Sequence, residues 1–121
     1  MATRADYALV KAEVEGRGAF TTIRTDEHGR CNLVCASSKS SDGLHGSSFW
    51  IWFCKKTGDW YLCTWCPCYY RIPSKVDLAG LCVECLALQN RAIFELPPDF
   101  VYRHNLVEIQ EEHFDKLYCE N

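Results

Sequence analysis

Five cysteines in the middle of the chain have a spacing that could bind a metal ion. Cys63, Cys66, Cys82 and Cys85 form two CxxC pairs in the order CxxC…CxxC, and their separation falls within the range of four-thiolate zinc sites. Tetrahedral zinc needs four donors, and one CxxC turn can deliver two of them. Cys68 could replace Cys63 as a ligand. Zinc is therefore the one cofactor that the sequence suggests.

Plain burial is the interpretation of these cysteines that the pattern favours. Residues three apart in a strand point to opposite faces, so Cys63 and Cys66 can share an ion only if the chain turns between them. Cys82 and Cys85 fall on an apolar helix face, where free cysteine acts as a small hydrophobe. A redox or catalytic thiol needs an acidifying element such as a helix N-terminus, and after Cys68 no helix is expected to begin until Ser74.

Aromatic residues gather in the same part of the chain. Segment 49–54 is apolar on both faces of a predicted strand, whereas a sheet covered on one side alternates apolar and polar residues. Either helices cover both faces, or one face meets a protein partner, a second copy of the chain or a ligand. The tryptophans and tyrosines of this region are the candidate partner-binding residues: Trp50, Trp52, Trp60, Tyr61, Trp65, Tyr69 and Tyr70.

A helix at the N-terminus and two hairpins are predicted to come first. Thr3 stands three residues before Asp6 and begins a helical apolar spacing that Gly16 and Gly18 close. From Ala19 the period changes to two, which indicates a strand.

The hairpins are predicted from alternation and glycine-bearing turns. A second strand over 30–36 completes the first hairpin, and the strands near 49–56 and 60–66 form the other. Between the two hairpins, the small and polar segment 37–48 is expected to be a flexible loop.

Helices dominate the rest of the predicted chain. Ser74, three residues before Asp77, caps a mostly buried helix over 75–92. A brief strand and a closing helix over "EEHFDKLY" follow. The fold class is therefore α+β: an antiparallel sheet of four to five hairpin-linked strands, with an N-terminal helix, a long buried helix and a short C-terminal helix packed on it. Residues 1–121 are predicted to form a single domain.

Composition narrows the choice of function. The 121 residues carry a formal net charge of −3 and no basic run longer than Lys55-Lys56, so a nucleic-acid partner is disfavoured. No signal peptide and no membrane-spanning window is found, which predicts a cytoplasmic protein. We expect a small non-enzymatic interaction domain that binds a protein partner, or itself, through the aromatic hairpin, and that could neutralise or regulate that partner. The alternatives are a zinc-stabilised binding module and a thiol-dependent enzyme or redox protein.

Overall fold

The structure, a computed structural model, describes residues 4–64, 67–74, 76–89 and 96–121. Two of the predicted site residues, Trp65 and Cys66, lie outside these ranges. The helices and strands follow one another along the chain in this order: α1 (Arg4–Glu15), β1 (Phe20–Thr25), β2 (Cys31–Ser40), β3 (Gly43–Phe53), β4 (Trp60–Cys63), β5 (Tyr69–Ile72), α2 (Leu78–Gln89), α3 (Pro98–Arg103), β6 (Val107–Ile109) and α4 (Glu111–Cys119).

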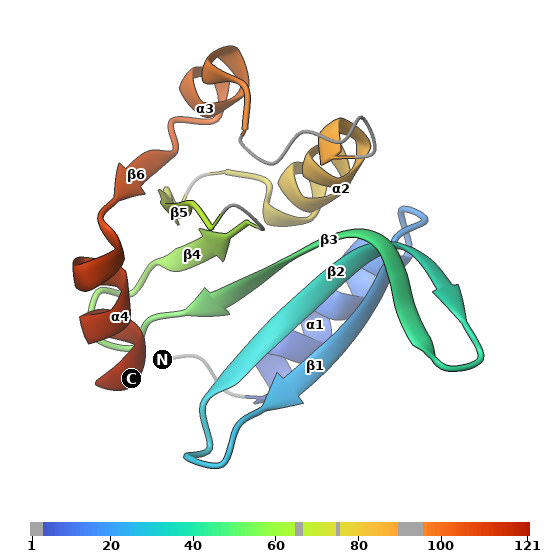
Figure 1. Ribbon diagram of the computed structural model, residues 1–121, viewed down its shortest axis with the longest axis horizontal. Coiled ribbons are helices and arrows are strands. Elements are labelled where there is room, and N and C mark those ends of the chain that lie inside the picture. The colour runs from blue at the N-terminus through green and yellow to red at the C-terminus, as the bar shows by residue number, and fades with distance from the viewer. Residues whose placement is uncertain (1–3, 65–66, 75, 90–95) are drawn as a thin grey trace.

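The strands form one antiparallel sheet in which each strand pairs with the next one along the chain. The order is β1-β2-β3-β4-β5-β6, and β5 and β6 are joined across α2 and α3 (Figure 1). The α+β class and the antiparallel sheet are thus confirmed, together with the N-terminal helix and its end near Gly16. No helix within the described residues is long and apolar enough to cross a membrane.

Helices pack on both faces of this sheet, which explains why β3 is apolar on both sides. Phe49 and Ile51 point into the larger cluster of buried residues, here called the first core, which includes residues of α1, α2 and α3. Trp52 points to the opposite face and belongs to the second core: Trp52, Cys54, Tyr61, Cys63, Tyr69, Phe114 and Leu117. The second core is closed by α4, which contributes Phe114 and Leu117.

The strand count and segment 37–48 differ from the sequence prediction. The sheet has six strands because β6 adds to its edge beside β5. Residues 37–48, predicted as a loop, instead continue β2 and β3 around a turn at residues 41–42, with the pairs Ser38↔His45 and Ser40↔Gly43. Pairing satisfies backbone groups that a loop would leave to water, and the φ of +133° at Gly43 suits the tight reversal.

Helix α1 fixes β1 and the ends of the central strands. The Lys11 ammonium donates to the Thr21 carbonyl oxygen at 3.0 Å and to its hydroxyl at 2.9 Å, so a backbone acceptor on the edge strand is occupied. The buried Tyr7 hydroxyl donates to the Cys31 carbonyl at 3.1 Å and accepts from the Phe53 amide at 2.8 Å. These two groups lie just beyond the last β2–β3 pair, Leu33↔Ile51.

We expect the Tyr7→Phe substitution to lower the free energy of unfolding by about 1–3 kcal/mol, because two half-buried backbone groups lose their partner. Urea unfolding followed by circular dichroism measures this change. Tyr102→Phe is the matched control, since Tyr102 is 84% exposed, and it should change stability by less than about 0.5 kcal/mol. Equal effects of the two substitutions would contradict the assigned role of Tyr7.

Candidate functional site

The described cysteines of the predicted zinc site lie in two different cores. Cys63 lies in the second core, whereas Cys82 and Cys85 are buried in the first core on the opposite face of the sheet. Cys68, the substitute for Cys63, packs against the first core and takes part in a disulfide. Within the described ranges, no group of three or more His, Cys, Asp or Glu side chains could hold a metal ion. The sheet therefore separates Cys63 from Cys82 and Cys85.

The helical cysteines instead meet a third cysteine that the sequence did not connect with them. Cys35 on β2 is hydrogen-bonded to Cys82, and it also interacts with Cys85. Hydrogen bonding to Cys35 and burial together raise the pKa of Cys82 well above its ordinary value, and burial raises the pKa of Cys85. These thiols stay protonated at neutral pH, as expected for buried cysteines that pack as small hydrophobes. The inward position of Cys35 in its strand was the signal that could have found this contact.

The six predicted partner-binding aromatics that the structure describes do not share one exposed face. Trp52, Tyr61 and Tyr69 are buried in the second core, and Tyr70 is buried in the first core. Trp60 is half-buried and packs against the first core, 5.0 Å from Tyr7 between ring centroids. Trp50 is half-buried on the second face. Among the described aromatics of this set, Trp50 is therefore the one that is both accessible and located on the face opposite α1 and α2.

Helix α4 covers the second face through an aromatic cluster. The Phe114 ring stacks on Tyr69 at 4.1 Å between centroids and meets Trp52 edge-on at 5.5 Å. Tyr118 packs edge-on against Trp50 at 5.4 Å, and its hydroxyl accepts a hydrogen bond from Asn32 at 3.2 Å. These contacts hold α4 over β3 to β5, and the hydrogen bond from Asn32 extends the contact to β2.

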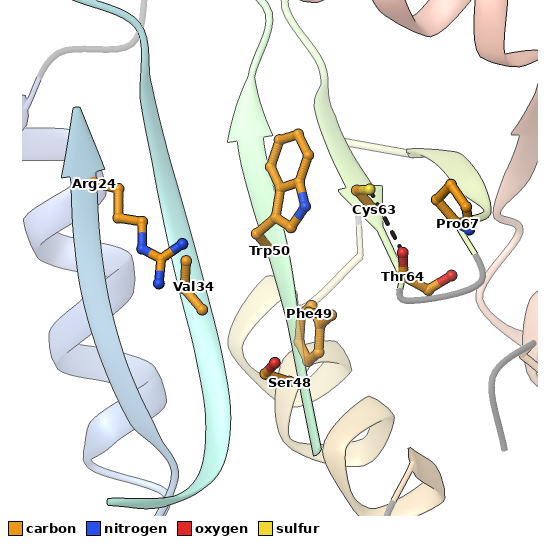
Figure 2. A pocket seen from close by; sticks show the side chains of 8 residues that line it. All are labelled: Arg24, Val34, Ser48, Phe49, Trp50, Cys63, Thr64 and Pro67. Carbon is orange, nitrogen blue, oxygen red and sulfur yellow. Dashed lines mark hydrogen bonds between the residues drawn. The ribbon is translucent and has the colours of Figure 1, made fainter. Parts of the chain in front are cut away.

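A hollow of about 390 Å³ lies beside Trp50, a volume typical of ligand-binding clefts. Its lining, drawn in Figure 2, comes from strands β1 to β4 and the segment after β4: Arg24, Val34, Ser48, Phe49, Trp50, Cys63, Thr64 and Pro67. The Cys63 thiol donates to the Thr64 carbonyl at 3.6 Å. Burial raises the pKa of Cys63 to about 12, so the thiol is an apolar part of the hollow and not a nucleophile.

Arg24 gives the hollow its charge. Four other arginines have described side chains, and each pairs with a carboxylate: Arg17 with Asp77, Arg30 with Asp26, Arg71 with Asp59, and Arg103 with Glu84. Arg24 forms no ion pair with any carboxylate of the described residues. Figure 2 shows its guanidinium beside Val34, on the side of the sheet that carries Trp50. The hollow therefore combines apolar surface with an uncompensated positive charge.

A second cavity, of about 640 Å³, lies where α2 meets the end of α3. Glu84 of α2 binds both Arg103 and His104, the latter at 2.9 Å, and Asn105 beside them has a positive φ of 54°. Hydrogen bonding from Arg103 lowers the pKa of Glu84, and His104 acts in the same direction. Since the Glu84 carboxylate already contacts both Arg103 and His104, it links α2 to the end of α3.

The burial of Cys63 predicts slow alkylation. At neutral pH, iodoacetamide should modify Cys63 more than about a hundredfold more slowly than the exposed Cys119, because a raised pKa removes the reactive thiolate. Timed quenching followed by peptide mass spectrometry gives the two rates. In urea the rates should become similar, which controls for sequence context. Similar rates in the folded protein would revive the interpretation of Cys63 as a reactive thiol.

The lowered pKa of Glu84 predicts a pH-dependent contribution to stability. This contribution is present above the unfolded-state pKa of the carboxyl group and is lost as the pH falls through the lower folded-state value. Glu84→Gln should therefore destabilise at neutral pH, by no more than about 1 kcal/mol because both partners are more than a third exposed. The difference should vanish in acid. Urea unfolding across the pH range tests this, with the exposed Glu13→Gln as control; a pH-independent difference would contradict it.

Comparison of the chain with protein-family models, with curated proteins and with solved structures finds no match. No activity or ligand can therefore be carried over from a relative. The hollow beside Trp50 is therefore the feature of this chain that bears on function.

Proposed function

We propose that the protein is a small, non-enzymatic binding domain that recognises a protein partner through the hollow beside α4, and that it regulates or neutralises that partner. The single observation that carries the proposal is the hollow itself, where the half-buried Trp50 borders a cleft of about 390 Å³. Tryptophan is enriched at binding hot spots, which lie in desolvated pockets at the centre of interfaces.

The composition of the hollow supports binding. Val34, Trp50 and Pro67 supply apolar contact, and Ser48 and Thr64 bring hydroxyl groups. Its one thiol, Cys63, stays protonated because of burial, so it does not supply the nucleophile that a thiol enzyme would need. Apolar surface with a polar rim is the usual make-up of a protein interface.

The rigid surroundings of the hollow also suit recognition. Its residues belong to paired strands, since Val34 faces Trp50 across β2 and β3, and Trp50 faces Cys63 across β3 and β4. Side chains held by a sheet lose little conformational entropy on binding. Seven of the eight described cysteines are free thiols and Cys68 is disulfide-bonded; the predominance of free thiols favours a reducing compartment such as the cytoplasm.

Filling the hollow should abolish partner binding. We expect the wild-type chain to capture a stoichiometric partner from lysate of its own source. The Ser48→Trp variant should not capture this partner, because the new tryptophan side chain occupies the cleft. Quantitative mass spectrometry of the captured proteins measures the loss, which should be at least about tenfold if one hot-spot pocket is blocked.

Tyr102→Ala serves as the matched control, because Tyr102 is exposed on α3, and it should capture the partner as well as the wild type does. Circular dichroism and urea unfolding of both variants show whether the fold is kept. A partner that the folded Ser48→Trp variant retains, or the absence of any stoichiometric partner, would refute the proposed function.

A further inference from the structure

The uncompensated charge of Arg24 restricts what can occupy the hollow. Each of the other arginines with a described side chain pairs with a carboxylate of this chain. Arg24 is exposed on β1 and forms no such pair within the described residues. Its guanidinium lies beside Val34 at the rim of the apolar hollow (Figure 2). An anion binding there would displace none of the ion pairs that these described residues make.

A partner that covers Trp50 brings its own surface beside the exposed Arg24 guanidinium. Charged groups across an interface are arranged so that opposite charges meet, and this complementarity determines which partner is bound. Guanidinium groups bind carboxylates through two parallel charged hydrogen bonds, so an aspartate or glutamate complements this charge with a single side chain.

A carboxylate fits this site better than a phosphate group does. Phosphate carries nearly two negative charges at neutral pH, and the hollow offers one arginine, on a chain whose formal net charge is −3. Phosphate recognition normally relies on a cluster of arginines. We therefore expect the group that binds Arg24 at the rim of the hollow to be a carboxylate side chain.

The placement of Arg24 relative to Trp50 also sets a spacing. The guanidinium lies over β2, beside Val34, and Trp50 belongs to the adjacent strand. Neighbouring strands are about 4.8 Å apart, and in an extended peptide side chains on the same face recur every second residue, at about 6.6 Å. Side chains at positions i and i+2 of an extended segment can therefore reach both places at once.

We infer that the occupant of the hollow is an extended segment of a protein partner that carries an aspartate or glutamate two positions from a large apolar residue. The carboxylate binds the Arg24 guanidinium, and the apolar side chain packs against Trp50 in the hollow. This inference rests on the proposed function and adds the chemistry of the segment that is recognised.

A random-peptide library displayed on phage, selected against the immobilised full-length chain, tests the inference. Wild-type protein should enrich peptides with an acidic residue two positions from an aromatic or large aliphatic residue. Arg24→Glu should reverse the charge preference and enrich lysine or arginine at the acidic position. Enrichment of the same peptides by both proteins would overturn the inference.

A peptide from this selection then allows a quantitative test by fluorescence polarisation. Arg24→Gln should weaken its binding about tenfold to a hundredfold, the value expected for charged hydrogen bonds. The weakening should nearly vanish when the acidic residue of the peptide is also changed to its amide. Arg71→Gln is the matched control, because Arg71 is ion-paired with Asp59 and does not line the hollow; it should leave the affinity unchanged.

Separate outcomes distinguish the inference from the proposed function. If the enriched peptides lose binding to the Ser48→Trp variant but bind the Arg24→Gln variant as tightly as the wild type, the inference is overturned and the proposed function stands. If no enriched peptide loses binding to the Ser48→Trp variant, both are overturned. A phosphoserine peptide that binds more tightly than its glutamate counterpart, in an Arg24-dependent manner, would overturn the carboxylate assignment. Urea unfolding of the Arg24 variants confirms that they fold.

Discussion

The burial of β3 on both of its faces is the constraint on which the rest of the structure depends. Ile51 and Trp52 are adjacent in the chain, point in opposite directions and are both fully buried. A strand of this kind folds only if the chain supplies helices on each side of the sheet. Helices α1 and α2 cover one face, and α4 must return to the other face after β6.

The length of α4 decides how much of the second face is covered. Nine residues give a helix of about 13 Å, whereas six paired strands span about 24 Å across the sheet. One such helix therefore cannot cover the whole face. The uncovered part contains the hollow, with Trp50 and Arg24 at its border, so the proposed site arises from the same packing that builds the second core.

The contact between α4 and the sheet is less complete than the packing of the first core. Trp52 Nε1 and Asn32 Oδ1 are buried without a hydrogen-bond partner among the described residues, and each such group costs about 1–3 kcal/mol. Aromatic contacts with Phe114 and Tyr118 offset this cost. The second core is thus held mainly by ring packing, which tolerates small shifts of the helix better than a network of directed hydrogen bonds does.

The sequence predicted the helices and strands along the chain better than it predicted which residues the fold brings into contact. Capping and glycine signals located α1, and alternation located the hairpins, because these signals depend on local backbone preferences. Segment 37–48 was misjudged, since strand pairing overrode its small polar composition. The CxxC spacing could not reveal that a sheet separates Cys63 from Cys82. The free charge of Arg24 was also beyond the sequence, since it depends on which carboxylates the fold brings to the other arginines.

The pairing of each strand with its successor has a consequence for how the chain folds. Five consecutive strands, β1 to β5, are joined by short connections, so most of the sheet can be assembled from contacts between residues that are close in sequence. Loop-closure entropy is then small at every step, and low contact order is associated with rapid folding. The sheet can grow outward from any one hairpin. Only the pairing of β6 with β5 requires a long connection to be closed.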